Sequence, residues 1–380
     1  MKKWIYVLLL FVFLCSGYLF WSGKDRVHST ESFYPRYVIE NLESYGENKG
    51  NGNVLALSPY LHTYDFSSQD AFYNMLNYYI SLAQRKKLIN DSTILVLPEY
   101  IGTWLVVAEE KKAVYSDTSI NTAMRTMIFS NLGKFGRAYA QSSSTDKTTE
   151  AIFKMKAEKM LHIYQTCFSK LAKTYKITIA AGSIVLPEPS VTNGKIVLKK
   201  SGKLYNISAV FGPDGNVQQP LTKKIFPIEA EKSFTASENR KEIPVYKSNA
   251  GNFAILICAD AWYPSRYEVL KNKEIDILLV PSFVSGNNSW TKKWEGYSGA
   301  PTPKDIDTTD VGYLTEREAW LKYAMTNRIS SAKIKTGVNV FLRGEFWNIG
   351  SDGHTLIWNN TAIESKETRE KAGSLVNVWL

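Results

Sequence analysis

The feature that most constrains the fold is a series of short, mostly apolar runs separated by segments with helical spacing. The runs lie at 92–98, 177–182, 252–257, 275–281 and 338–342, and apolar positions recur at helical spacing in 69–88 and 150–175. Runs of this length fit strands that are buried on both faces of a sheet. Strands that alternate with helices indicate one α/β domain with mixed sheets.

The N-terminus carries a second, separate signal. An apolar run from Trp4 to Trp21 follows Lys2 and Lys3. Its length is at the short end for crossing a bilayer, with aromatic residues at both ends as at a membrane interface. A signal peptide cleaved after Gly17 is the competing interpretation. In either case the rest of the chain is expected to be exported, so that the folded domain lies on the extracytoplasmic side.

Composition divides the chain into three parts. Residues 1–22 are predicted to be a signal anchor or signal peptide, the polar residues 23–50 a linker, and residues 51–380 one folded domain. Hydrophobic residues make up 44% of the chain and charged residues 22%, which is the balance of a globular protein. The stretch 101–150 is less regular than its surroundings and is a candidate lid.

The charge and the cysteine content exclude several classes of protein. The net charge is +10, but the basic residues are scattered in short pairs without a nucleic-acid-binding motif, so nucleic acid is not expected as a partner. Only three cysteines are present, which is too few for a disulfide-stabilised scaffold.

Two residues that could carry chemistry follow apolar strands. Cys258 comes directly after the run 253–257 and precedes a turn-forming segment that ends in Pro264. Such a position resembles the sharp elbow that presents a nucleophile at the rim of a sheet. Glu99 similarly ends the run 94–98, where a desolvated carboxylate would be a useful base. Taken alone, either residue could instead be ordinary: a buried structural cysteine and a loop glutamate.

Other catalytic classes have little support in the sequence. The four histidines (His28, His62, His162 and His354) lie away from the cysteine segment along the chain. The serine elbow, the common zinc motifs and the phosphate-binding loop are all absent from the sequence. No cofactor and no metal are therefore expected.

Three segments, taken in order, resemble the nitrilase or carbon–nitrogen hydrolase superfamily. Residues 95–99 are similar to the strand that ends in the family's Pro-Glu. Residues 211–215, followed by 221–224, are similar to the hairpin that delivers the family's lysine. Residues 255–264 are similar to the family's nucleophile elbow. The resemblance covers about residues 53–360 and implies an αββα sandwich with mixed sheets.

The resemblance also implies a Glu–Lys–Cys triad. It assigns Glu99 as the base and Cys258 as the nucleophile. The lysine could be Lys223 or Lys224, and the spacing from the preceding turn favours Lys223. The nucleophile would attack an amide carbonyl and form a thioester, which water then releases with the help of the glutamate.

Two further positions come from the same resemblance. A second family glutamate, eight positions after the lysine, corresponds to Glu231, with Glu229 as the fallback. The backbone N–H of Ala259 would support the oxyanion together with the lysine. Ser265 and Ile225 depart from residues that the family often has, glutamate and histidine respectively, and this leaves the substrate less defined than the chemistry.

The expected function is hydrolysis of a small, non-peptide amide or carbamoyl compound, with nitrile hydrolysis as a minority possibility. Two alternatives stay open: a membrane-associated N-acyltransferase using the same acyl-enzyme, and a catalytically silent binding domain. Discharge of an acyl-Cys258 by water alone would favour hydrolysis, and a requirement for an amine would favour transfer. The expected partners are a small amide or acyl substrate, the membrane through the N-terminal segment, and a second copy of the chain in a homo-oligomer.

Overall fold

Two six-stranded sheets form the centre of the molecule. A computed structural model describes residues 2–28, 37–238, 242–366 and 371–380. In spatial order, the first sheet consists of β1 (Ile39–Tyr45), β20 (Gly373–Trp379), β2 (Asn53–Ser58), β4 (Thr93–Val96), β5 (Thr178–Ala180) and β10 (Val210–Phe211). The second consists of β12 (Val245–Ser248), β13 (Gly251–Ile255), β14 (Ile277–Ser282), β15 (Thr336–Phe341), β18 (Leu356–Asn359) and β19 (Ala362–Glu364).

Both sheets mix parallel and antiparallel pairs, as the sequence predicted. In the first sheet β2, β4 and β5 are parallel, and in the second β13, β14 and β15 are parallel. Antiparallel strands flank both groups. Each of the five apolar runs overlaps one of the parallel strands β4, β5, β13, β14 and β15, so the strand predictions are confirmed.

Smaller sheets extend the two large ones. They contain β11 (Thr222–Lys223), β9 (Leu204–Ser208) and β6 (Ile184–Pro187); β17 (Ile349–Asp352), β16 (Arg343–Phe346) and β3 (Tyr60–His62); and β7 (Ser190–Thr192) with β8 (Lys195–Val197). The predicted turn at 212–215 closes with a hydrogen bond of 2.7 Å from the Gly215 N–H to the Gly212 carbonyl.

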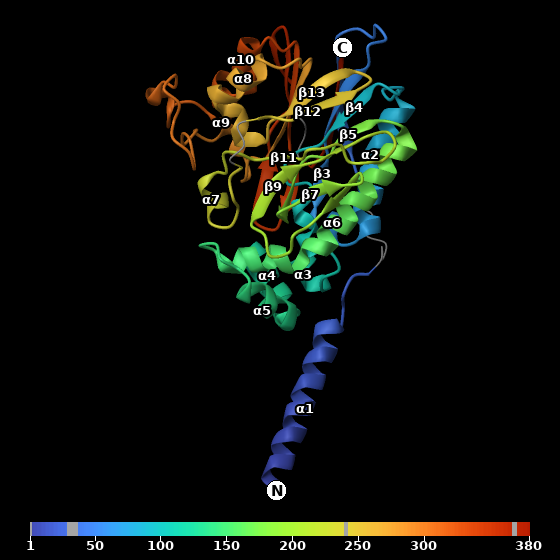
Figure 1. The fold of residues 1–380 in the computed structure, drawn as a ribbon, viewed down its shortest axis with the longest axis vertical. Helices are drawn as coiled ribbons and strands as arrows, with labels where there is room; N and C mark the ends of the chain where they lie inside the picture. Colours follow the sequence, from blue (N-terminus) through green and yellow to red (C-terminus); the bar gives the residue numbers. More distant parts are fainter. Residues whose placement is uncertain (1, 29–36, 239–241, 367–370) are drawn as a thin grey trace.

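Helices cover the outer faces of the two sheets, which gives four layers (Figure 1). The pair α2 (Gln69–Arg85) and α6 (Lys147–Tyr175) packs on the first sheet, and α8 (Pro264–Lys271) and α10 (Met325–Arg328) pack on the second. The other helices of the body are α3 (Lys112–Ser116), α4 (Ile120–Phe129), α5 (Leu132–Ala140), α7 (Glu229–Lys232) and α9 (Glu316–Tyr323). The predicted αββα sandwich is therefore confirmed.

Side-chain alternation along the strands builds three cores, one between the sheets and one under the helices on each outer face. In β2, Val54 and Ala56 point into the space between the sheets, whereas Leu55 and Leu57 point toward α2 and α6. Successive residues of a strand face opposite sides, so a strand covered on both faces must be apolar at every position. This explains why the buried strands read as continuous apolar runs.

Two segments differ from the sequence-based expectation. Within residues 23–50, taken as a linker, β1 pairs in parallel with β20 and so belongs to the first sheet, while residues 29–36 lie outside the described chain. The helix expected over 315–336 is interrupted at Ala324, whose extended backbone (φ −101°, ψ −150°) separates α9 from α10. Neither segment has the long apolar runs that made the other elements recognisable.

The N-terminal helix α1 (Lys2–Gly23) projects away from the body (Figure 1). The span Lys3–Gly23 is long and apolar enough to cross a membrane, and none of its most apolar window is buried against the protein. A signal sequence would have the same properties.

We expect Gly182→Ala to lower the stability of the fold next to Glu99. Gly182 has φ +61°, and a Cβ there would lie 2.1 Å from the Pro98 carbonyl oxygen. A side chain in this conformation costs about 1–3 kcal/mol, and the contact requires the backbone before Glu99 to move. Thermal and chemical denaturation of the full chain in detergent measure the loss.

The matched control is Gly133→Ala in α5, where a Cβ would meet no atom within 4 Å. This variant should be stabilised by about 0.5–1 kcal/mol, because alanine favours the helix over glycine. Equal stability of the Gly182→Ala variant and the wild type would contradict the steric argument.

Candidate active site

Cys258 begins a sharp turn immediately after the second sheet. It follows β13 by three residues and opens a short 3₁₀ helix, Cys258–Trp262. Its backbone φ of +49° lies in the left-handed region, which a residue with a side chain rarely adopts. The Cys258 thiol lies 3.7 Å from the Phe283 carbonyl oxygen and is 7% exposed. The strained elbow expected from the sequence is present.

Glu99 comes from the first sheet and meets this thiol. It follows β4 by three residues and is 1% exposed. Its carboxylate interacts with the Cys258 thiol closely enough to shift the pKa of each group, and it accepts a hydrogen bond of 2.9 Å from the Lys224 Nζ. Residues that end strands in two different sheets therefore converge in one buried cluster.

The lysine of this cluster is Lys224, whereas the sequence favoured Lys223. The Lys224 Nζ donates to Glu99 at 2.9 Å and to Glu231 at 2.6 Å. The Lys223 Nζ instead lies 3.5 Å from Glu238 and 4.2 Å from the centre of the Tyr205 ring. Neighbouring residues of an extended chain point to opposite sides, so a one-residue error in spacing selects the wrong side chain.

The pairing of β11 with β9 explains which lysine enters the cluster. Lys223 is opposite Ile207, and the Lys224 N–H donates to the Asn206 carbonyl at 2.8 Å. The Asn206 amide nitrogen in turn donates to Glu99 at 2.8 Å. Residues directly across from each other share one face of the sheet, so Lys224 points the same way as Asn206.

Glu231 completes the cluster, as the sequence expected. It lies in α7 and is 3% exposed. Besides Lys224, its carboxylate accepts hydrogen bonds from the Asn206 amide at 3.2 Å and from the Tyr100 hydroxyl. The fallback Glu229 pairs instead with Lys232 at the surface, at 3.4 Å.

The charges of the cluster follow from burial and from the central ammonium. Burial raises the pKa of Glu99 to about 7, although Lys224 opposes the rise. Burial would also raise the pKa of Glu231, but Lys224 and further donors hold it below its usual range. Burial would lower the pKa of Lys224, yet the two carboxylates keep it well above its ordinary value.

The thiol itself is neutral in the resting site. Burial and the neighbouring Glu99 raise the pKa of the Cys258 thiol well above its ordinary value, with Lys224 opposing them. A carboxylate with a pKa near neutrality can accept the thiol proton as a nucleophilic attack begins. The arrangement thus brings a thiol, a carboxylate and an ammonium together in one buried cluster.

Asp260 connects the nucleophile turn to the lysine strand. Its buried carboxylate accepts hydrogen bonds from the N–H groups of Ile225 at 3.0 Å and Phe226 at 2.8 Å. These residues directly follow Lys224, and Asp260 lies two positions after Cys258. Burial raises the pKa of Asp260 to about 6, while the donated bonds lower it. The contact fixes the position of the segment that carries Lys224 relative to the segment that carries Cys258.

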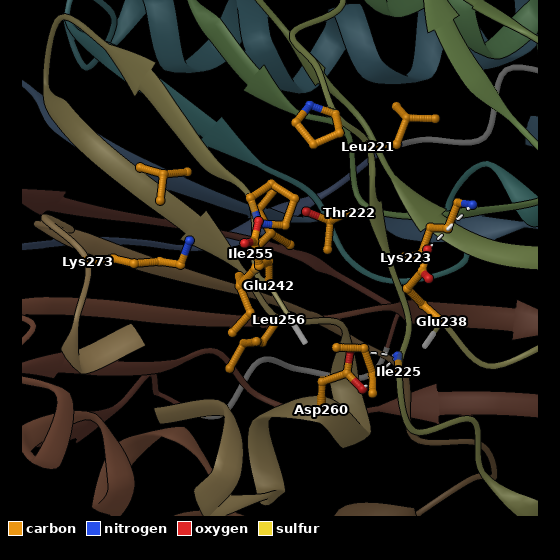
Figure 2. A pocket seen from close by; sticks show the side chains of 14 residues that line it. Leu221, Thr222, Lys223, Ile225, Glu238, Glu242, Ile255, Leu256, Asp260 and Lys273 are labelled. Carbon is orange, nitrogen blue, oxygen red and sulfur yellow. Dashed lines mark hydrogen bonds and ion pairs between the residues drawn. The ribbon is translucent and has the colours of Figure 1, made fainter. Parts of the chain in front are cut away.

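A cavity of about 260 Å³ lies on the far side of this connection (Figure 2). Lys223, Glu238 and Asp260 are among its lining residues, and the side chains of Lys223 and Glu238 lie next to each other there. Cys258, Glu99 and Lys224 do not line it. This pocket is therefore separate from the nucleophile.

Three cluster residues were missed by the sequence analysis: Tyr100, Asn206 and Asp260. Tyr100 directly follows Glu99, and Asp260 lies within the nucleophile segment, so proximity to the motifs was an available signal. Asn206 had no such signal, because only strand pairing brings it to the carboxylates. Ala259 follows Cys258 in the turn and is half-buried, and its role at the oxyanion stays a prediction.

Known proteins resemble this chain in sequence. The sequence model of the carbon–nitrogen hydrolase family matches residues 66–300. The probable hydrolase YhcX of Bacillus subtilis (strain 168) is 26% identical over 118 residues, which is 31% of this chain and 20% of that protein. The match therefore spans about a fifth of the curated relative's length.

Solved structures share the fold at low sequence identity. A variant of the amidase from Nesterenkonia sp. AN1, with the acetamide moiety of fluoroacetamide bound covalently to its active-site cysteine, has a TM-score of 0.51 and 11% identity over 88% of this chain and 93% of that one. Another variant, in complex with butyramide, has a TM-score of 0.50 and 11% identity over 92% and 94% of the two chains.

The two adjacent lysines should contribute differently to stability. Lys224→Met removes the only cation that bonds Glu99 and Glu231 among the contacts of the described residues, whereas Lys223 pairs with Glu238 near the surface. We expect Lys224→Met to lower the free energy of unfolding by about 3–5 kcal/mol at a pH above 7.

Lys223→Met is the matched control and should change the free energy of unfolding by less than about 1 kcal/mol. Denaturant titration of both variants gives the comparison. Equal losses would mean that the buried cluster does not depend on Lys224. The Lys224→Met loss should shrink below pH 7, where Glu99 becomes protonated.

Proposed function

Because the chain belongs to the carbon–nitrogen hydrolase family, we propose that it hydrolyses a small, non-peptide amide through a thioester at Cys258. The observation that carries this proposal is the convergence of Cys258, Glu99 and Lys224 in one buried cluster, in which the Lys224 Nζ lies 2.9 Å from Glu99. A thiol, a base and a cation in this arrangement are the groups that acyl transfer to sulfur requires.

The first half of the reaction forms the thioester. Glu99 takes the proton from the Cys258 sulfur as the sulfur attacks the amide carbonyl carbon. The Lys224 ammonium and the Ala259 N–H stabilise the oxyanion, each good donor contributing about 3 kcal/mol. Glu99 then gives its proton to the leaving nitrogen, the carbon–nitrogen bond breaks, and the amine departs.

The second half returns the enzyme to its starting state. Glu99 takes a proton from a water molecule, whose oxygen attacks the thioester carbon. The carbon–sulfur bond breaks, the thiolate regains the proton from Glu99, and the carboxylic acid leaves. Glu231 holds Lys224 at 2.6 Å and shares the Asn206 amide with Glu99, so it keeps the cation and the base in place.

The substrate class is inferred from the family and from the relative with the same fold. The Nesterenkonia amidase reacts with fluoroacetamide at its cysteine and binds butyramide in another variant. Cys258, Glu99 and Lys224 are all buried, which also favours a small acyl group. We therefore infer a short aliphatic amide or a carbamoyl compound as substrate.

We further propose that α1 is a retained membrane anchor and that the catalytic domain lies on the extracytoplasmic side. The lysines at the N-terminus favour a cytoplasmic start of the helix. The base of the helix is joined to the body: the Arg26 guanidinium bonds Glu110 at 3.0 Å, and the Lys111 Nζ bonds the Trp21 carbonyl at 2.6 Å. A signal peptide that is cleaved from the protein would not need such contacts with the folded domain.

Fluoroacetamide should add one acetamide moiety to the full chain, at Cys258. Cys167 is 1% exposed, and burial raises the pKa of its thiol to about 12, so it should remain unmodified. Mass spectrometry of the intact chain and of its peptides identifies the site.

Cys258→Ala should lose labelling and lower amide turnover by on the order of 10³-fold or more, with an unchanged unfolding transition. Cys167→Ala is the control and should keep both labelling and turnover. Labelling at Cys167, or a folded Cys258→Ala variant with full turnover, would refute the assignment of the nucleophile.

The rate of amide hydrolysis should fall as the pH drops below 7. Burial raises the pKa of Glu99 to about 7, so the base is protonated and inactive below that pH. The value of kcat/KM should therefore drop about tenfold per pH unit well below pH 7. Glu99→Gln should be nearly inactive at every pH, and a wild-type profile that stays flat down to about pH 5 would exclude Glu99 as the base.

A further inference from the structure

We propose that α4 and α5 seat the catalytic domain on the lipid headgroup region of the membrane that α1 crosses. The surface in question, here named the α4–α5 surface, consists of the exposed side chains of Arg125, Phe129, Leu132, Lys134, Arg137 and Tyr139. The inference rests on the proposed anchor but not on the proposed chemistry.

Large apolar side chains are exposed on this surface. Phe129 is 56% exposed, Leu132 45% and Tyr139 44%. The three lie within eleven positions of one another, on two consecutive short helices whose other faces pack on the body through Ala123, Met127 and Ala138. Exposed apolar clusters of this kind mark contact surfaces.

The charge of the same segment identifies an anionic partner. Residues 118–145 contain no aspartate and no glutamate, and Arg125, Lys134 and Arg137 are all exposed. Helices with an apolar face flanked by lysine and arginine lie in the plane of a membrane interface. Each basic residue near an anionic lipid surface strengthens the attraction of the helix to that surface.

The surface lies beside the base of α1 (Figure 1). The Tyr18 hydroxyl in α1 accepts a hydrogen bond of 3.0 Å from the Leu132 N–H at the start of α5. The Arg26 guanidinium, just beyond the helix, donates to the Ser130 carbonyl at 2.8 Å and to the Asn131 side chain at 3.2 Å. The helix base and the α4–α5 turn are thus in direct contact.

This contact sets the depth of the surface in the bilayer. At 1.5 Å per residue, a helix of 22 residues is about 33 Å long, which matches the hydrocarbon core. Tyr18 and Trp21 near its end are aromatic residues of the type that lie at headgroup level. Because Tyr18 bonds the backbone of Leu132, the exposed side chain of Leu132 lies close to that level.

A buried ion network makes the placement rigid. The Glu110 carboxylate, which is 0% exposed, bonds Arg26 at 3.0 Å and Lys156 of α6 at 2.6 Å. Lys156 belongs to the long helix that covers the first sheet, so the end of α1 is tied to the core of the domain. The chain therefore cannot hold α1 in a bilayer while the α4–α5 surface turns freely away from it.

Site-directed spin labelling of the full chain tests the depth directly. A cysteine replaces Leu132 in a background with Cys15→Ala, Cys167→Ala and Cys258→Ala, and the labelled protein is inserted into vesicles of phosphatidylethanolamine and phosphatidylglycerol. The relative collision rates with oxygen and with a water-soluble nickel complex should place the label roughly 5–10 Å below the headgroup boundary. A label at Tyr313, which is 71% exposed outside the surface, should stay in water.

The charge contribution is tested by reversing it. Arg125→Glu, Lys134→Glu and Arg137→Glu together should move the label at position 132 toward water. The same change at three other exposed lysines, Lys86, Lys195 and Lys247, should leave its depth unchanged. Circular dichroism confirms that each labelled chain is folded.

Two results would overturn the proposal. Nickel accessibility at position 132 equal to that at position 313 would show that the surface faces water. Dipolar broadening between labels at position 132 that persists in detergent would show that the surface is covered by a second copy of the chain instead of lipid.

Discussion

The site depends on one buried ammonium held between two carboxylates. Lys224 bonds Glu99 and Glu231, and each of the three residues is at most 3% exposed. Without the cation, two buried negative charges would face each other, and both would be forced toward protonation. With the cation present, the pKa values of the two acids differ. The pKa of Glu231 is held below its usual range, so this acid stays ionised, whereas the pKa of Glu99 is raised to about 7.

The rest of the fold serves to bring these groups together. Glu99 ends a strand of one sheet, Cys258 follows a strand of the other, and Lys224 comes from a small sheet that lies between them in the sequence. Asp260 joins the last two by accepting the N–H groups that follow the lysine. A sandwich of two sheets is suited to this task, because strand ends from both layers open on the same rim.

Sequence reasoning succeeded where a pattern has a local physical cause. Buried parallel strands must be apolar at every position, and this made the runs before Glu99 and Cys258 recognisable. It failed at Lys223, because the choice of lysine depends on which residue at the end of β11 lies opposite Asn206 of β9. It also assigned β1 to a linker, since a short edge strand with polar residues carries no distinctive pattern.

The sequence by itself determined the layered α/β fold, the apolar N-terminal helix and the segments that supply a thiol and two acids. Those properties follow from short-range periodicity and composition, which a single chain displays directly. Only the tertiary structure decided that Lys224 is the cation, that Asn206 and Tyr100 support the acids, and that burial outweighs the lysine in setting the pKa of Glu99. These depend on strand register and on desolvation, which arise only when distant segments pack together.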